Sequence, residues 1–136
     1  MLDPIHDECG VVGVYRMDVC PHGDALRSPL EEERNVVRIL PDMLIDLQNR
    51  GQLAAGISRY NEDELRIIDT YKDVGSVSDV FHLTYPEPSK FRNLIDRYSG
   101  RAAIGHVRYA TCGKDDPAYA QPFEQPHGRK WKWFAF

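Results

Sequence analysis

The segment Cys9-Gly10-Val11-Val12-Gly13-Val14-Tyr15 is a short apolar run of β-strand character that begins with a thiol. Glycine weakens a strand unless another group must approach its backbone closely, so the two glycines here indicate a functional strand. A cysteine that opens a core strand is also a common and purely structural arrangement, because free cysteine behaves as a small hydrophobic residue. The segment alone leaves both interpretations open.

Removal of residues 1–8 would give Cys9 a free α-amine beside its thiol. An α-amine ordinarily has a pKa of about 7.7 to 8.0 and a thiol one of about 8.5, so such an amine can act as general base for its own thiol near neutral pH. The eight residues are too few to fold and too polar to target a membrane. We therefore predict that residues 1–8 are a propeptide and that residues 9–136 form the domain.

A zinc site is the alternative role for Cys9, because His6, Cys20 and His22 also lie early in the chain. Their spacing lacks the C-x-x-C and H-x-x-x-H pairs of known zinc sites, which disfavours this role. We expect no metal here, and a surface loop at residues 20–23.

The composition of the 136 residues is that of an ordinary soluble domain with a real core. An apolar fraction of 42%, a charged fraction of 28% and a net charge of −4 give no reason to expect nucleic acid or an anionic membrane as partner. The sequence contains neither an apolar run of about 20 residues nor a signal peptide, so we expect a cytoplasmic protein. The three cysteines argue against a disulfide scaffold.

The stretch after Ser28 has the pattern of a helix. Ser28 can cap it and Glu31 completes a capping box, while Pro41 must kink or divide it and Gly51 closes it. One apolar face recurs at three- and four-residue spacing, formed by Val36, Val37, Leu40, Met43, Leu44 and Leu47.

The remainder of the chain alternates strands with helices. We predict a strand of small residues at 54–57, a turn at 61–64, a strand at 65–71, a helical turn at 74–81, a helix from a Ser89 cap to Gly100, and a strand at 102–109. A polar loop is expected at 113–128, followed by a strand at 131–136. Because natural domains rarely stop on such a strand, we expect that the sequence is truncated and that this strand has an exposed apolar edge.

Three ordered stretches, 9–14, 47–57 and 105–113, resemble the glutaminase domain of class II glutamine amidotransferases. Within that class the chain is most similar to the amidophosphoribosyltransferases, because of the Leu-Gln-x-Arg-Gly-Gln form at 47–52 and the Ala-Gln-Pro-Phe segment at 120–123. Sugar-aminating relatives usually carry other residues in place of Gln52 and Tyr109. The resemblance implies an α+β N-terminal nucleophile hydrolase fold, an αββα four-layer sandwich of antiparallel sheets, incomplete at the C-terminus.

The resemblance also implies a glutaminase site. The Cys9 thiolate is expected to hydrolyse glutamine to glutamate and ammonia, which the full-length protein would pass to phosphoribosyl pyrophosphate to give phosphoribosylamine in purine biosynthesis. Arg108 suits the substrate α-carboxylate, because its guanidinium can bind a carboxylate in bidentate fashion, and Thr111 is expected to add a hydrogen bond. Arg50, Gly51 and Tyr109 are expected to have structural roles near the site.

Two further residues near these motifs are expected to be structural. A histidine in a strand is more often a packed residue than a catalytic base, and the mechanism already has a base in the Cys9 α-amine, so His106 is expected to be a packed strand histidine. Cys112 is expected to be a structural thiol. Asn49 and Leu53 depart from the family, which usually has histidine and an acidic residue there, and both are expected to tune packing around the site.

The family places its oxyanion donors, an asparagine and a glycine, beyond Phe136, together with the whole phosphoribosyltransferase half. The chain alone is therefore expected to be inactive, with no cofactor of its own. Mg²⁺ is expected only with the missing half, the presence of an iron–sulfur cluster stays open, and the full-length protein is expected to form a homo-oligomer. The alternative is a degenerate or truncated domain that binds glutamine, or packs against a partner, without catalysis.

Overall fold

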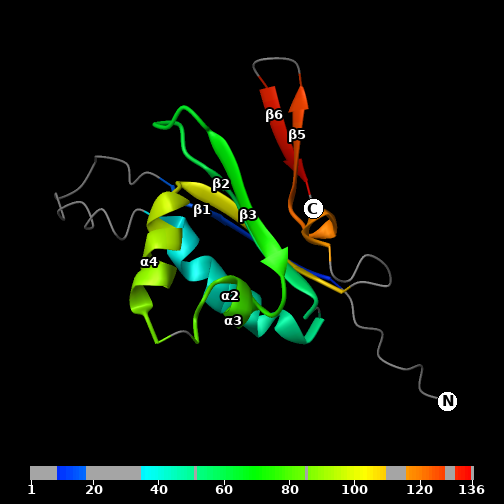
Figure 1. Ribbon diagram of the computed structural model, residues 1–136. Coiled ribbons are helices and arrows are strands. Elements are labelled where there is room, and N and C mark those ends of the chain that lie inside the picture. Colours follow the sequence, from blue (N-terminus) through cyan, green and yellow to red (C-terminus); the bar gives the residue numbers. More distant parts are fainter. Residues whose placement is uncertain are drawn as a thin grey trace.

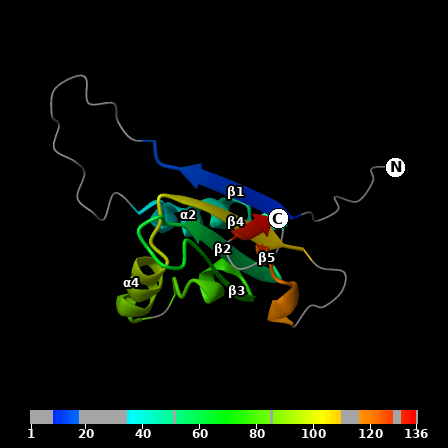
Figure 2. The same ribbon diagram turned by 90° about the horizontal axis from the view of Figure 1, so that it is seen from above.

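The computed structural model describes residues 9–17, 35–50, 52–84, 86–109, 116–127 and 131–135, and its centre is one antiparallel sheet. The strands lie in the order β1-β4-β2-β3, with β1 (Gly10–Tyr15) and β3 (Ile68–Val74) at the edges and β4 (Ala102–Arg108) and β2 (Ala54–Tyr60) between them (Figure 1). Figure 2 shows β1 along one edge of this sheet. Because Gly10 pairs with Val107 and Ala54 pairs with Arg108, the start of β1, the start of β2 and the end of β4 lie at the same end of the sheet.

Helical segments cover one face of the sheet (Figure 1). They are η1 (Val36–Ile39), α2 (Leu40–Asp46), η2 (Gln48–Arg50), α3 (Val77–Val80) and α4 (Pro88–Arg97). The predicted division at Pro41 is confirmed, because a 3₁₀ turn precedes α2 and Pro41 occupies the first turn of α2. Asn35 caps η1 by accepting a hydrogen bond from the Val37 amide at 3.1 Å, whereas the expected cap Ser28 and the stop Gly51 lie outside the described residues. No helix in the described ranges is long and apolar enough to cross a membrane.

The core lies between the helices and the sheet. Leu40 and Leu44 are fully buried against it, and each such side chain contributes about 1.5 to 3 kcal/mol. A Cβ on Gly105 would lie 2.9 Å from Val12 Cγ2 and 3.1 Å from Leu44 Cδ1. The absence of a side chain at Gly105 therefore lets α2 approach β4 closely.

The other face of the sheet is covered in part by residues 116–127, which contain η3 (Pro117–Tyr119) and β5 (Phe123–His127). β5 pairs with β6 (Trp131–Ala135) in a two-stranded hairpin that stands apart from the helices (Figure 1). A Cβ on Gly56 would lie only 2.3 Å from the Gln121 carbonyl oxygen. The predicted role of the small residues at 54–57, which is close packing of backbones, is thus confirmed.

Several predicted boundaries were wrong. The strand expected at 54–57 runs to Tyr60, because β3 and β4 pair with it along that whole length. The helical turn expected at 74–81 is limited to α3, since Val74 still belongs to β3. The strand expected at 65–71 begins at Ile68, because β2 ends at Tyr60 and offers no pairing partner beyond it. The helix expected after a Ser89 cap begins at Pro88, whose ring suits the first helical position, and Glu87 is the N-cap without a side-chain hydrogen bond. The loop expected at 113–128 includes η3 and β5, which form because the segment meets the sheet and β6 rather than from any local periodicity.

Candidate active site

Cys9 lies directly before β1, at the sheet end where β4 finishes. Gly10 pairs with Val107, so continuation of the antiparallel register brings Cys9 beside Arg108. The exposed thiol donates a hydrogen bond to the Tyr109 carbonyl oxygen, with 3.7 Å between the sulfur and the oxygen. A Cβ on Gly10 would lie 2.9 Å from Val107 Cγ2 and 3.0 Å from Leu47 Cβ, so glycine is required for β1 to lie this close to the helices.

Arg108 is the last residue of β4 and is only 9% exposed. Alternation along β4 directs Arg108 and His106 to the face opposite the helices, since Val107 and Gly105 contact residues of the helical layer. The Arg108 guanidinium carbon lies 5.6 Å from the centroid of the Tyr119 ring, within the range of a cation–π contact. A buried guanidinium and an accessible thiol therefore lie at the same end of the sheet.

His106 is buried beneath this site, with 3% of its surface exposed. Burial, together with the nearby positive charge of Arg108, lowers the pKa of His106 to about 4. Its Nδ1 atom has no hydrogen-bond partner among the described residues. The imidazole is therefore neutral at pH 7, in keeping with a packed strand histidine rather than a general base.

Of the remaining residues predicted for the site, some lie near the thiol and others lie outside the described part of the chain. Tyr109 is 42% exposed and contributes its carbonyl to the thiol contact. Arg50 is exposed at the end of η2, which contacts β4, and the neighbouring Gln48 accepts a hydrogen bond from the Val77 amide at 2.7 Å. Gly51, Thr111 and Cys112 lie outside the described residues.

Sequence reasoning missed two residues of this region. Tyr119, which contacts Arg108, and Lys72, which holds the segment carrying Tyr119, belong to no recognised motif. The only local signal was the Ala-Gln-Pro-Phe segment at 120–123, which directly follows Tyr119.

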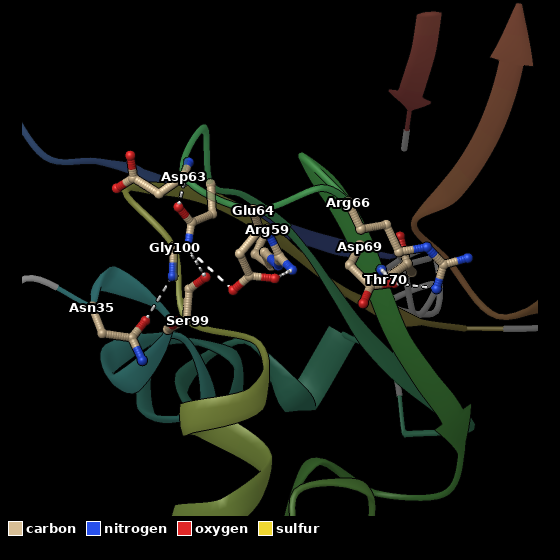
Figure 3. Close-up of polar contacts among 10 residues, drawn as sticks. Asn35, Arg59, Asp63, Glu64, Arg66, Asp69, Thr70, Ser99 and Gly100 are labelled. Atoms are coloured by element: carbon tan, nitrogen blue, oxygen red, sulfur yellow. Dashed lines mark hydrogen bonds and ion pairs between the residues drawn. The ribbon is translucent and has the colours of Figure 1, made fainter. Parts of the chain in front are cut away.

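The far end of the sheet carries a structural polar cluster (Figure 3). Asn35 Oδ1 accepts a hydrogen bond from the Gly100 amide at 3.1 Å, and the buried Arg59 forms an ion pair with Glu64. A polar cavity of about 290 Å³ lies beside this cluster, lined in part by Asn35 and Gly100. A second cavity of about 310 Å³ lies between β3 and β5. In the ranges that the structure describes, no group of three histidine, cysteine or acidic residues is arranged to hold a metal ion.

No family model matches the chain, but curated proteins do. It is 34% identical over 119 residues to the amidophosphoribosyltransferase of Methanothermobacter thermautotrophicus, covering 88% of this chain and 20% of the relative. It is 40% identical over 121 residues to the chloroplastic amidophosphoribosyltransferase 3 of Arabidopsis thaliana, covering 89% and 18%. It is 32% identical over 127 residues to the human amidophosphoribosyltransferase, covering 92% and 21%. The chain thus spans about a fifth of the length of the curated relatives it matches.

Two solved structures share the fold. One is the glutamine phosphoribosylpyrophosphate amidotransferase from B. subtilis complexed with ADP and GMP, with a TM-score of 0.54 and 27% identity over 73% of this chain and 18% of that chain. The other is described as the allosteric regulatory enzyme of purine biosynthesis, with a TM-score of 0.54 and 28% identity over 71% and 18%. These likenesses confirm the predicted α+β fold of N-terminal nucleophile type, here incomplete. The chain is therefore homologous, over most of its length, to the N-terminal glutaminase region of amidophosphoribosyltransferases.

Proposed function

We propose that this chain is the glutamine-hydrolysing part of a glutamine-dependent amidophosphoribosyltransferase. The observation that carries the proposal is that the accessible Cys9 thiol and the buried Arg108 lie at the same end of the sheet. The thiolate attacks the carboxamide carbon of glutamine, the carbon–nitrogen bond breaks, and ammonia leaves with the proton that came from the thiol. Water then cleaves the thioester, which releases glutamate and restores the thiol.

The base in this scheme is the α-amine of Cys9. While Glu8 precedes Cys9, that nitrogen is an amide without basicity, so the working enzyme must be cleaved between the two residues. His106 is a poor substitute because burial keeps its pKa near 4. N-terminal sequencing and intact mass of active protein test the cleavage, and active protein that still begins at Met1 would refute it.

Arg108 is the proposed partner of the glutamine α-carboxylate. A planar guanidinium offers two parallel N–H donors to a carboxylate, and the low exposure of Arg108 strengthens such bonds by limiting competition from water. Thr111 is proposed to add a hydrogen bond to the substrate, while Arg50, Gly51 and Tyr109 support the surroundings of the thiol.

The ammonia acceptor is proposed to be phosphoribosyl pyrophosphate, bound by a part of the full-length protein outside this chain. Support comes from the names of the relatives, which are amidophosphoribosyltransferases. Mg²⁺ is proposed to act only with that other part, and the glutaminase step itself needs no cofactor because thiol and amine both belong to Cys9. A homo-oligomeric, cytoplasmic full-length protein remains a prediction.

The decisive experiment uses the full-length protein and a glutamine analogue that bears an electrophilic carbon. We expect release of glutamate from glutamine, and one adduct that peptide mass spectrometry places on Cys9. Cys20 and Cys112 serve as internal controls, because a thiol that no general base activates should react slowly. Glutamine binding without hydrolysis or adduct would instead support the alternative of a non-catalytic binding domain, and Cys9→Ala should abolish both signals in an active enzyme.

A further inference from the structure

The segment that enters β5 is anchored firmly to the sheet. Lys72 Nζ donates hydrogen bonds to the carbonyl oxygens of Ala120 at 2.6 Å and Pro122 at 3.3 Å, and it lies 4.5 Å from the centre of the Phe123 ring. Ala120 is fully buried, and Gly56 leaves room for the backbone of Gln121 to lie against β2. Movement of this segment would therefore break several contacts at once.

Tyr119 is attached directly to this anchor. It ends the short turn η3, in which the Ala120 amide donates to the Pro117 carbonyl at 3.0 Å and the Ala118 amide donates to Asp116 Oδ1 at 2.8 Å. The Tyr119 residue is 50% exposed, and its ring centroid lies 5.6 Å from the Arg108 guanidinium carbon. One side chain, held by a hydrogen-bonded turn, thus contacts the group proposed to bind the substrate.

We propose that Tyr119 is a positioning residue that fixes the orientation of the Arg108 guanidinium and thereby lowers the KM for glutamine. The inference rests on the proposed function for its effect on glutamine, while the contact itself does not. A guanidinium binds a carboxylate through two N–H groups only in one plane, and the face of an aromatic ring attracts the cation and limits that plane. The phenol hydroxyl has no part in this, so the ring alone should suffice.

The first test needs no substrate. Phenylglyoxal modifies arginine guanidinium groups, and mass spectrometry of the peptide gives the rate at the slightly exposed Arg108. A cation–π contact with a half-exposed ring such as that of Tyr119 corresponds to about a two- to fivefold difference in equilibrium. Tyr119→Ala should therefore raise the Arg108 rate by about that factor, and Tyr119→Phe should not. Equal rates in the wild type and Tyr119→Ala would overturn the proposal.

The chain offers a matched control in Tyr15. Its exposed ring lies 5.5 Å from the Arg101 guanidinium carbon, and Tyr15 is paired with Ala102 at the opposite end of β1 and β4. Tyr15→Ala removes a second arginine–tyrosine contact, in which Arg101 also donates a hydrogen bond to the Tyr15 hydroxyl at 3.3 Å. Given the rise of a strand, this contact lies about 20 Å from Cys9. The substitution should change the phenylglyoxal rate at Arg101 and leave that at Arg108 unchanged; a similar rise at Arg108 would indicate general loosening and contradict the proposal.

The second test is kinetic and uses the full-length protein. Tyr119→Ala should raise the KM for glutamine about two- to fivefold with little change in kcat, Tyr119→Phe should behave as wild type, and Tyr15→Ala should not alter the KM. In an Arg108→Lys background, Tyr119→Ala should have no further effect, because it acts through Arg108. An unchanged KM, or a fall in kcat alone, would overturn the positioning role. Wild-type protein that does not hydrolyse glutamine would refute the proposed function instead, and the phenylglyoxal rates would still decide the contact.

Discussion

Replacement of Gly56 by alanine tests how the 116–127 segment is seated on the sheet. The added Cβ would lie 2.3 Å from the Gln121 carbonyl oxygen, 2.6 Å from Lys72 Cβ and 3.1 Å from the Tyr71 carbonyl oxygen. Real Cβ atoms do not approach other atoms so closely, and two of these three neighbours are backbone atoms that no side-chain rotation can move aside. The segment that carries Tyr119 must therefore shift away from β2.

The expected cost of Gly56→Ala is about 2 to 3 kcal/mol, the upper part of the range for overpacking a well-packed site. Amide hydrogen exchange of β2 and β3 measures this loss locally, including in a multidomain protein, and 2 kcal/mol corresponds to roughly 30-fold faster exchange of protected amides. Because the segment holds Tyr119 against Arg108, the KM for glutamine should rise in the same variant.

Gly13→Ala is the matched control in the same sheet. A Cβ there would have Ile104 Cγ2 as its nearest neighbour at 4.0 Å, which is ordinary contact. This change should be neutral, or stabilising by about 0.4 to 1 kcal/mol through the unfolded chain. For Gly13→Ala we expect the exchange of β2 amides to be unchanged or slower. The same result for Gly56→Ala would refute the close packing of the 116–127 segment on the sheet.

Three further outcomes are expected. Arg108→Lys loses the two parallel N–H donors that bind a carboxylate, so the KM for glutamine should rise by the equivalent of about 1.5 to 3 kcal/mol. Ammonia-dependent synthesis by the full-length protein should survive. An unchanged KM would contradict the assignment of Arg108 to the glutamine carboxylate. His106 has a pKa near 4 in the folded protein, below the unfolded value of 6.5, so the unfolded chain binds the proton first as the pH falls. Up to about 3 kcal/mol of stability, present above pH 6.5, should therefore be lost as the pH falls to 4. Titration of the ring near pH 6.5 in the folded protein, followed by NMR, would refute this. Glu64→Gln leaves the buried Arg59 without its carboxylate partner and should lower the free energy of unfolding by about 1 to 3 kcal/mol, measured by thermal unfolding. Glu62→Gln, which alters a partly exposed ion pair with Arg101, should have little effect. Equal losses in the two variants would contradict this reasoning.

Local sequence patterns determined those helices and strands that are marked by a hydrophobic period or by a residue with a specific backbone effect, such as proline. The apolar run after Cys9, the alternation that leads to Arg108 and the apolar face around Leu40 each gave an element in the expected place. The division at Pro41 followed from the ring of one residue, without reference to any tertiary contact. The order and spacing of three motifs indicated the family, since such spacing is a property of the chain itself.

Tertiary structure decided whatever depends on residues far apart in the chain. The start of β3 is set by where β2 ends, and β5 exists because β6 pairs with it, so neither had a local signal. The low pKa of His106 arises from burial under segments that local patterns do not relate to it. The contact between Tyr119 and Arg108 joins two residues with no shared motif, through a turn whose place on the sheet depends on Lys72 and on the missing side chain of Gly56. The physical reason is the same in each case: packing and electrostatics act through space, whereas a sequence pattern reports only neighbours along the chain.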